Sequence, residues 1–249
     1  MSKLELLLVA GLRGDGRKPN EIRRLACRFG VFDDCDGSFY LEMGNTKVLA
    51  VVYGPREVQM KSKEQIDKAY VECVVSVSPF SGLERKQISK NNRQTQEMAL
   101  AIQRCYENVI LTHLYPHSQI SIHLSIISSD GSLLSACINA ATLALIDAGV
   151  PMSDFLVSCT AGYIERTCLI DLNNQESRTG GVVLPVAWLP RTNSFPLVTM
   201  DSKIPLNVFE DILNSAREGC RQVYNILSNE VKENALRMIQ SERRFEKDQ

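Results

Sequence analysis

Carboxylates are the first residues to consider, because phosphoryl transfer needs them to hold a divalent ion or to deliver a proton. In residues 168–190 the candidates are Asp171 and Glu176, and residues 177–189 contain no carboxylate. This stretch therefore offers little to a mechanism that depends on paired carboxylates. Asp171 and Glu176 are the remaining candidates for acid-base work in this block.

The spacing of cysteines and histidines gives no metal-binding pattern. The eight cysteines contain no C-x-x-C pair, and most lie in apolar stretches where a free cysteine behaves as a small hydrophobe. We expect core thiols in a reducing compartment. His113, His117 and His123 are close in sequence, but the strand-like alternation around them leaves no i, i+4 pair for a metal. We predict no metal site and no cofactor.

Asp130, Gly131 and Ser132 precede an apolar, alanine-rich segment with the composition of a buried helix. The free N–H groups and the positive end of such a helix favour a phosphate or a carboxylate. The local sequence favours a simpler interpretation, in which Asp130 or Ser132 caps the helix. These residues alone leave both interpretations open.

Charge is balanced over the whole chain but not along it. The 249 residues contain 28 Lys+Arg and 29 Asp+Glu, which excludes a protein that holds nucleic acid through overall basicity. The basic clusters all fall within the first 93 residues, and this concentration favours a local phosphate-contact surface. The clusters are Arg13/Arg17/Lys18, Arg23/Arg24, Lys61/Lys63 and Arg85/Lys86/Lys90/Arg93.

Hydrophobic periodicity predicts strands followed by a helix, twice over. This order predicts an α+β fold of two similar layers around one core, as a single domain over residues 1–249 with pseudo-repeat halves of about 1–127 and 128–249. The predicted strands are 39–43, 48–53, 70–77, 119–127, 155–164, 168–172, 182–189 and 195–200, and the predicted helices are 92–111, 133–148 and a long one from about 207.

The composition is that of a soluble globular protein, with 44% hydrophobic and 23% charged residues. The apolar run 4–10 is short, contains Glu5 and leads into charged residues, so we expect no signal peptide. No run approaches 18 uninterrupted apolar residues, which predicts no membrane span. We expect the charged stretch 241–249 to fray.

Several longer motifs are similar to those of one known family. Residues 12–17 read Leu-Arg-Gly-Asp-Gly-Arg, which looks like the R-x-D-G-R signature of RNase PH-like proteins. The chain resembles this family over essentially its whole length, in collinear order, and most resembles the ring subunits of the eukaryotic RNA exosome. The further matching segments are 36–38, 42–46, 53–55, 145–152 and 171–173.

The resemblance implies a ribosomal protein S5 domain 2-like fold, internally duplicated, with mixed sheets packed on central helices. It also implies a six-membered ring of such subunits paired as heterodimers, topped by three cap proteins with S1 or KH modules in a nine-subunit core. In active relatives the RNA 3′ end enters the central channel. Inorganic phosphate then attacks the terminal linkage and releases nucleoside diphosphates.

Carried over position by position, the resemblance implies that the catalytic parts are missing. Active archaeal relatives have aspartates at the positions of Ser177 and Val183, and neither residue present here can bind Mg²⁺ as a carboxylate or act as a general acid. Their phosphate site follows Gly-Ser with arginine, whereas Gly131 and Ser132 are followed by Leu133. Without that guanidinium, a bidentate phosphate clamp is lost.

The resemblance leaves three candidate RNA-binding residues, Lys61 and Ser62 in a loop that faces the channel entrance in relatives, and Arg93, which is followed by Gln94 where relatives pair two arginines. We therefore expect a non-catalytic ring subunit that scaffolds the exosome and guides RNA 3′ ends to an associated nuclease, in rRNA processing and in mRNA and non-coding RNA decay. The implied localisation is the nucleus, nucleolus and cytoplasm.

Two alternatives stay open. The first is an active phosphate-dependent 3′ to 5′ exoribonuclease that uses a displaced carboxylate such as Asp171 or Glu176. The second is a free homohexamer that trims tRNA 3′ ends. The first predicts release of nucleoside diphosphates, and the second predicts self-assembly without partners.

Overall fold

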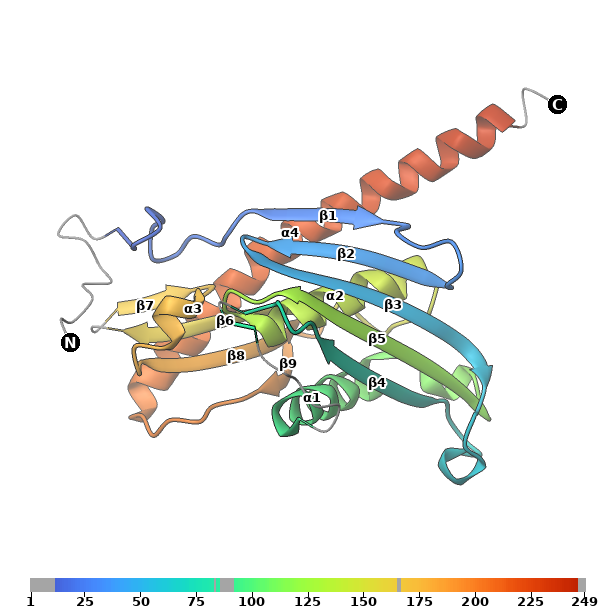
Figure 1. Ribbon diagram of the computed structural model, residues 1–249, viewed down its shortest axis with the longest axis horizontal. Coiled ribbons are helices and arrows are strands. Elements are labelled where there is room, and N and C mark those ends of the chain that lie inside the picture. Colours follow the sequence, from blue (N-terminus) through green and yellow to red (C-terminus); the bar gives the residue numbers. More distant parts are fainter. Residues whose placement is uncertain (1–11, 83, 86–91, 165–166, 246–249) are drawn as a thin grey trace.

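The computed structural model describes residues 12–82, 84–85, 92–164 and 167–245, and the apolar run 4–10 lies outside these residues. Two sheets and the helices packed between and beside them make up the chain (Figure 1), which confirms the α+β prediction. None of the described helices is long and apolar enough to cross a membrane.

The larger sheet has five strands in the order β1-β2-β3-β5-β4, and only β4 and β5 run parallel in it. Each central strand alternates buried and half-exposed residues, so one face of the sheet forms the core and the other remains open. The strands are β1 (Leu25–Phe29), β2 (Gly37–Met43), β3 (Thr46–Glu57), β4 (Tyr70–Val77) and β5 (Ser118–Ser128).

The smaller sheet is antiparallel, in the order β7-β6-β8-β9. Its main strands, β6 and β8, are buried along most of their length. The strands are β6 (Val157–Ile164), β7 (Thr167–Ile170), β8 (Val182–Leu189) and β9 (Ser194–Val198).

The described helices are α1 (Arg93–Val109), α2 (Leu133–Asp147), α3 (Asn174–Ser177) and α4 (Leu206–Phe245). Two 3₁₀ turns are η1 (Lys61–Lys63) and η2 (Thr112–Leu114).

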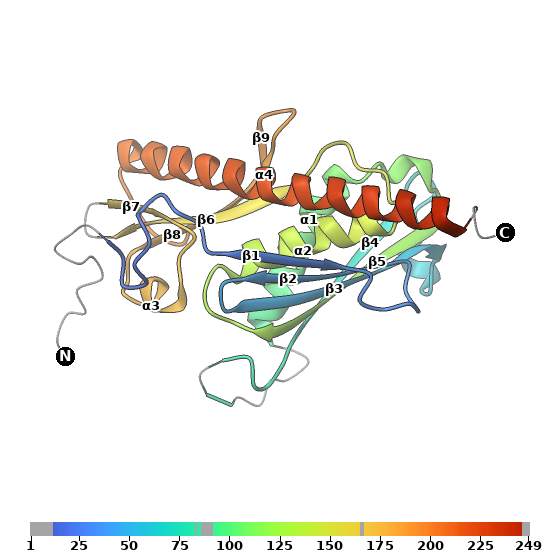
Figure 2. The same cartoon turned by 90° about the horizontal axis from the view of Figure 1, so that it is seen from above.

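Helix α2 is the central element and joins the two sheets. In Figure 2 it lies between α4 and strands β2 and β3, and its residues from Ser135 to Leu145 are buried all round. At Gly37 an added Cβ would lie 2.4 Å from the Ala144 carbonyl oxygen, so only glycine lets β2 approach α2 this closely. On the opposite side, Asn139 exchanges two hydrogen bonds with the backbone of Ser158 in β6 (2.8 and 2.9 Å). These contacts fix the middle and the end of α2 relative to both sheets.

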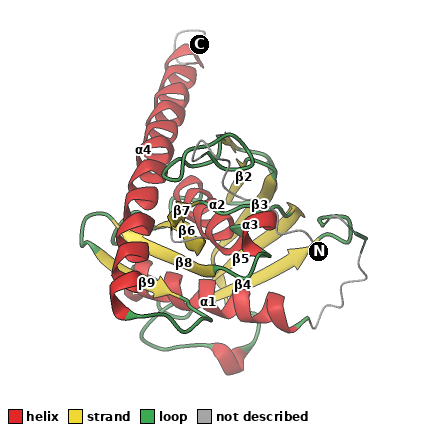
Figure 3. Ribbon diagram, turned by 90° about the vertical axis from the view of Figure 1, so that its left-hand side faces the viewer, coloured by secondary structure: helices red, strands yellow, loops and turns green. Residues whose placement is uncertain are grey.

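Three differences from the sequence-based elements stand out. The edge strand β1 and the one-turn helix α3 were not predicted. Strand β1 lies among arginines and no residue of it is fully buried, and α3 has only four residues. Helix α4 continues to Phe245, so fraying from residue 241 is wrong for the described part of the segment. Figure 3 shows this 40-residue helix running past both sheets and extending beyond them.

Candidate functional site

A cleft of about 770 Å³ lies where the beginnings of α1 and α2 meet. Asn92, Gln94 and Thr95 line it from the α1 side, and Leu133 and Leu134 line it from the α2 side. Further lining residues come from α1, from the end of β4 and the segment that follows it, from the segment that follows β5, from α3 and its C-cap, and from β8 and the segment that follows β9: Glu97, Met98, Ala101, Val77, Pro79, Ser81, Gly82, Glu84, Ser129, Asn174, Arg178, Pro185, Thr199 and Asp201. The cleft thus lies between the start of α1, which Arg93 begins, and Leu133, where active relatives have the arginine of their phosphate site.

Ser177 and Val183 make contacts that stabilise the fold. Ser177, the last residue of α3, donates its hydroxyl to the Asn173 carbonyl oxygen at 2.9 Å. Val183 packs against a small apolar cluster that includes Ile164 and Leu172. A hydroxyl and an isopropyl group do not fit the oxygen-rich shell that a divalent cation requires. Among the described residues, no group of three or more His, Cys, Asp or Glu side chains could hold a metal ion.

The two remaining carboxylates of this region are held by buried arginines. Arg13 is fully buried and pairs with Glu176, which is 2% exposed. Arg13 Nε donates to Glu176 Oε1 at 2.7 Å, and its NH2 group donates to Oε2. The same guanidinium also donates to the Ile170 and Asp171 carbonyl oxygens. Glu176 further accepts the backbone N–H of Asn173 in a capping box, so both its oxygens are engaged.

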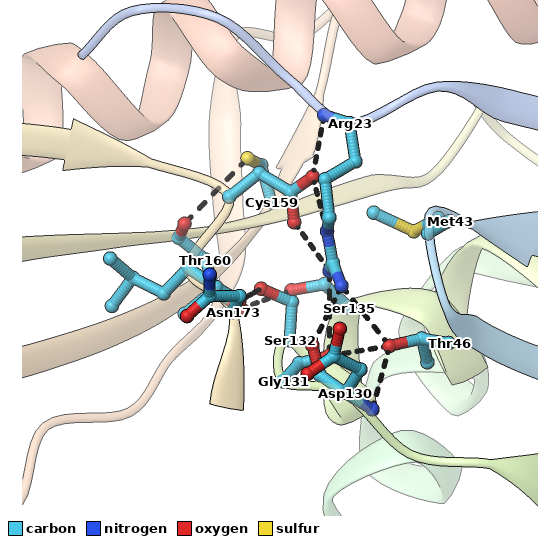
Figure 4. Close-up of polar contacts among 12 residues, drawn as sticks. Arg23, Met43, Thr46, Asp130, Gly131, Ser132, Ser135, Cys159, Thr160 and Asn173 are labelled. Carbon is cyan, nitrogen blue, oxygen red and sulfur yellow. Dashed lines mark hydrogen bonds and ion pairs between the residues drawn. The ribbon is translucent and has the colours of Figure 1, made fainter. Parts of the chain in front are cut away.

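Asp171 is the second of these carboxylates, and it pairs with Arg23. The Arg23 guanidinium also donates to the carbonyl oxygens of Asp130 and Gly131 (Figure 4). Arg23 Nε donates to Oδ2 at 2.9 Å and NH2 donates to Oδ1 at 2.7 Å, which is a bidentate pair. Burial alone would raise the pKa of Asp171, but the hydrogen bonds and charge of Arg23, with help from Arg17, hold that pKa below its usual value. Asp171 is therefore ionised at neutral pH and cannot donate a proton.

These ion pairs bear on the basic clusters that were predicted to form a phosphate-contact surface. Arg13 is fully buried, Arg23 is 6% exposed, and the side chain of Arg17 is 12% exposed and pairs with Asp15 at 2.9 Å. The prediction that these arginines belong to a phosphate-contact surface is wrong, because their charges are neutralised inside the protein. Two further members of the basic clusters, Lys86 and Lys90, lie outside the described residues.

The segment Gly131, Ser132 and Leu133 forms the sharp entry to α2. Gly131 has φ 82° and lies so close to Asn173 that an added Cβ would meet its backbone at 2.5 Å. Ser132 also has positive φ, and its hydroxyl donates to the Leu172 carbonyl oxygen at 2.9 Å. The Asp130 carboxylate accepts from the Asn45 side chain and from the Asn174 backbone.

The helix-capping interpretation of this entry is therefore wrong, because within the described chain Ser132 makes no side-chain bond to the start of α2 and Asp130 bonds elsewhere. Leu133 contributes an apolar side chain to the cleft wall at the position that the family resemblance assigns to an arginine. The start of α2 therefore offers backbone N–H groups to an anion, but position 133 adds no positive charge beside them.

The three predicted RNA-binding residues are exposed but not clustered. Lys61 and Ser62 lie in η1, beyond the end of β3 in Figure 1, and Arg93 begins α1. Strand β4 leads from the η1 side to the cleft, and its eight residues at about 3.3 Å each span roughly 25 Å. The Arg93 side chain is 90% exposed and pairs with Glu97 at 2.7 Å, which partly neutralises it. The structure leaves their role in RNA binding as a prediction.

Comparison with protein families gives two consecutive matches. Residues 21–151 match the model of the 3′ exoribonuclease family, domain 1, and residues 154–219 match domain 2 of the same family. Among solved structures, rice Rrp46 superposes with a TM-score of 0.80 at 25% identity, over 88% of this chain and 100% of that chain. The Archaeoglobus fulgidus exosome with RNA bound to the active site superposes with a TM-score of 0.75 at 18% identity, over 88% and 94%, which bears on the fold alone.

Characterised relatives align along nearly the whole chain. The Arabidopsis thaliana exosome complex component RRP41 homolog is 46% identical over 93% of this chain and 96% of its own length. The human exosome complex component RRP41 is 42% identical, over 94% and 96%, and the Thermococcus kodakarensis component Rrp41 is 36% identical, over 95% of each. The chain therefore belongs to the 3′ exoribonuclease family of RNase PH-like proteins, as a homologue of exosome complex component RRP41.

Proposed function

We propose that this chain is a non-catalytic ring subunit of the RNA exosome, which scaffolds the complex and guides RNA 3′ ends to an associated nuclease. The observation that carries the proposal is that residues 168–190, where active relatives have their aspartates, contain no carboxylate outside a buried ion pair. Ser177 and Val183 replace the two aspartates of active relatives, while Asp171 and Glu176 are buried in ion pairs. Removing a single transition-state contact often costs a few kcal/mol, and here an acid, a metal ligand and a phosphate clamp are missing together.

The displaced-carboxylate alternative meets a specific obstacle. To act as an acid or to bind a metal, Glu176 would have to leave Arg13, and Asp171 would have to leave Arg23. Either movement would strand a buried guanidinium without its partner, which costs several kcal/mol. The cost of leaving these guanidinium groups unpaired favours a non-catalytic subunit over phosphorolysis by this chain.

Product analysis of the assembled complex tests the proposal. The complex is purified through a tag on this chain and incubated with 5′-labelled RNA and Mg²⁺, with and without inorganic phosphate. Phosphorolysis releases nucleoside diphosphates only when phosphate is present, whereas hydrolysis by a docked nuclease releases monophosphates in both cases. We expect no phosphate-dependent diphosphate release. Its appearance would contradict the proposal and support the displaced-carboxylate mechanism instead.

The proposed assembly is a hetero-hexameric ring of RNase PH-like subunits with S1 or KH cap subunits, in a nine-subunit core that works in the nucleus, nucleolus and cytoplasm on rRNA precursors and decaying RNA. A free homohexamer is the competing assembly. Size-exclusion chromatography of the chain expressed alone distinguishes the two. We expect a monomer, a small oligomer or an aggregate, whereas the competing assembly would elute as a defined hexamer. Affinity purification with mass spectrometry should recover the other ring and cap subunits.

Lys61, Ser62 and Arg93 are the proposed RNA contacts of the channel. Contacts of this kind hold phosphates without reading bases, so binding through them should weaken as salt rises, with a slope of about 0.7 per phosphate on a log–log scale. Lys61→Glu combined with Arg93→Glu should weaken RNA protection by the assembled complex and leave assembly intact, because both side chains are exposed. Unchanged RNA protection by this double variant would remove both residues from the channel.

A further inference from the structure

The 3₁₀ turn η1 lies in the loop of residues 58–69, the η1 loop, which joins β3 to β4 and extends beyond both strands in Figure 1. None of the three residues of the turn is buried. A short turn without buried apolar contacts opens easily unless polar contacts hold it. Lys61 and Ser62 are exposed, whereas Lys63 is half-buried. The polar contacts of the loop therefore determine where the side chain of Lys61 can reach.

Glu72 of β4 and Gln119 of β5 anchor the η1 loop from the open face of the larger sheet. Lys63 Nζ pairs with Glu72 Oε1 at 3.0 Å and lies 5.2 Å from the centre of the Tyr70 ring. The Gln119 side chain, which is 6% exposed, accepts the Gln59 N–H at 3.3 Å and donates to Glu72 Oε2 at 2.7 Å. One connected network thus holds the loop both before the turn and at its last residue.

His117 provides a further anchor after the turn. Its Nδ1 atom lies 2.8 Å from Glu64 Oε1, and its backbone N–H donates to the Gln65 carbonyl oxygen at 3.3 Å. The loop is therefore fixed on both sides of Lys61 and Ser62, while these two residues remain exposed.

The two lysines of the turn carry the same charge but have different surroundings. Among the ion pairs of the described residues, none includes Lys61. The ammonium group of Lys63 is matched by Glu72, and a phosphate would have to compete with that carboxylate for it. The turn therefore offers one lysine to a polyanion and uses the other to attach itself to the sheet.

We propose that Glu72 and Gln119 are positioning residues for RNA binding. Through Lys63 and the loop backbone, they hold Lys61 and Ser62 in the place where these residues meet the RNA. The assignment rests on the proposed RNA-guiding function, and it makes Lys63 a support of the loop rather than a phosphate contact. A loop that is already ordered binds more tightly, because no conformational freedom is lost when the RNA arrives.

The Glu72→Gln substitution separates positioning from simple electrostatics, because the two predict changes of opposite sign. A carboxylate near RNA repels phosphates, so on charge alone its removal should tighten binding. If Glu72 positions the loop, binding should instead weaken by about two- to tenfold, and by no more than Lys61→Gln weakens it. Titrations of the assembled complex with a fluorescent single-stranded RNA measure this change. In a salt series, Lys61→Gln should also lower the salt slope by about 0.7.

Variants of Lys63 test whether Glu72 acts through it. Lys63→Arg keeps the ion pair and should bind RNA like the wild type, whereas Lys63→Gln should weaken binding as Glu72→Gln does. The double variant should be no weaker than the weaker single variant, because both changes remove the same interaction. Additive losses would show that the two residues act separately and would overturn the assignment.

The ion pair of Lys47 and Glu42 provides a matched control at the other end of β3. Its atoms are 3.1 Å apart, and its side chains are 42% and 32% exposed, against 39% and 29% for Lys63 and Glu72. Glu42 also accepts a second donor, the Tyr40 hydroxyl, at 2.7 Å. Glu42→Gln should therefore leave RNA affinity unchanged.

Hydrogen exchange of the complex without RNA reports on the loop directly. Peptides that cover residues 58–69 should exchange faster in Glu72→Gln and in Gln119→Met than in the wild type, because an anchor of the loop is lost. Lys61→Gln should leave their exchange unchanged. Unchanged exchange in both anchor variants would overturn the assignment.

The binding results separate the positioning assignment from the proposed function. If Lys61→Gln weakens binding but Glu72→Gln leaves it unchanged or tightens it, the assignment is overturned and the guiding function stands. The same conclusion follows if Glu42→Gln weakens binding as much as Glu72→Gln does. If the wild-type complex does not bind single-stranded RNA, both proposals fall.

Discussion

The Glu176→Gln substitution tests whether the buried ion pair holds the amino-terminal segment to the second half of the chain. The change keeps the shape of the side chain and removes its charge. Glu176 accepts three donors, namely Nε and NH2 of Arg13 and the backbone N–H of Asn173. A glutamine offers one oxygen in place of two, so at least one of these buried donors loses its acceptor.

The expected magnitude follows from the burial of both partners. An unsatisfied buried donor costs about 1–3 kcal/mol, and removal of one partner from a buried ion pair costs about 3–5 kcal/mol in total. Arg13 is fully buried, so water cannot replace the lost charge. With an m value of about 2 kcal/mol per M in urea, the unfolding midpoint should fall by roughly 1.5–2.5 M.

Urea unfolding of the purified full-length chain measures this shift. The chain has one tryptophan, Trp188, which is 5% exposed in β8 and reports on the second sheet. The control is Glu97→Gln, which removes an exposed partner of Arg93 and should leave the midpoint essentially unchanged. A Glu176→Gln midpoint within 0.3 M of the wild type, on the order of 0.5 kcal/mol, would refute the claim that this ion pair stabilises the fold.

Three further predictions concern acid stability, thiol reactivity and the missing carboxylates. The pKa of Asp171 is lowered in the folded state, so the ionised carboxylate stabilises the fold fully above the unfolded pKa of about 3.9, and this stabilisation is lost as the pH falls through the lower folded value. Asp171→Asn should therefore make the free energy of unfolding depend less on pH between about pH 2 and 5, as urea titrations at those pH values can show. Iodoacetamide should modify half-exposed Cys35 well before Cys137, whose burial raises the pKa of its thiol, as peptide mass spectrometry can show; equal rates would contradict the core packing. Ser177→Asp with Val183→Asp should not restore phosphate-dependent diphosphate release, because the phosphate clamp is still lost, and restored release would show that the carboxylates alone were limiting.

The hydrophobic pattern predicted every strand except β1 and every α-helix except α3 among the described residues. Strands β4 and β8 match the predicted ranges 70–77 and 182–189 to the residue, because each is bounded by a clear change in pattern. Helix α3 has only four residues, yet Asn173 and Glu176 form a capping box with the spacing that marks a helix start. That spacing is the signal in the sequence that could have located α3.

The ion pairs of the site could not be predicted from the sequence. Arg13 and Glu176 are 163 positions apart, and Arg23 and Asp171 are 148 apart, so no local pattern connects them. The arginines lie among other charged and polar residues, which is also the pattern of a solvated surface. Only the tertiary arrangement distinguishes a buried arginine in an ion pair from an exposed arginine that could contact phosphate.

The long separation of these partners has a consequence for synthesis of the chain on the ribosome. Arg13 is translated 163 residues before Glu176, and at about 5–20 residues per second the delay is roughly 8–30 s. Throughout that interval the guanidinium has no carboxylate to meet, and the segment around it cannot take its final place. The segment around Arg13 therefore takes its final place only after translation has passed β7 and α3.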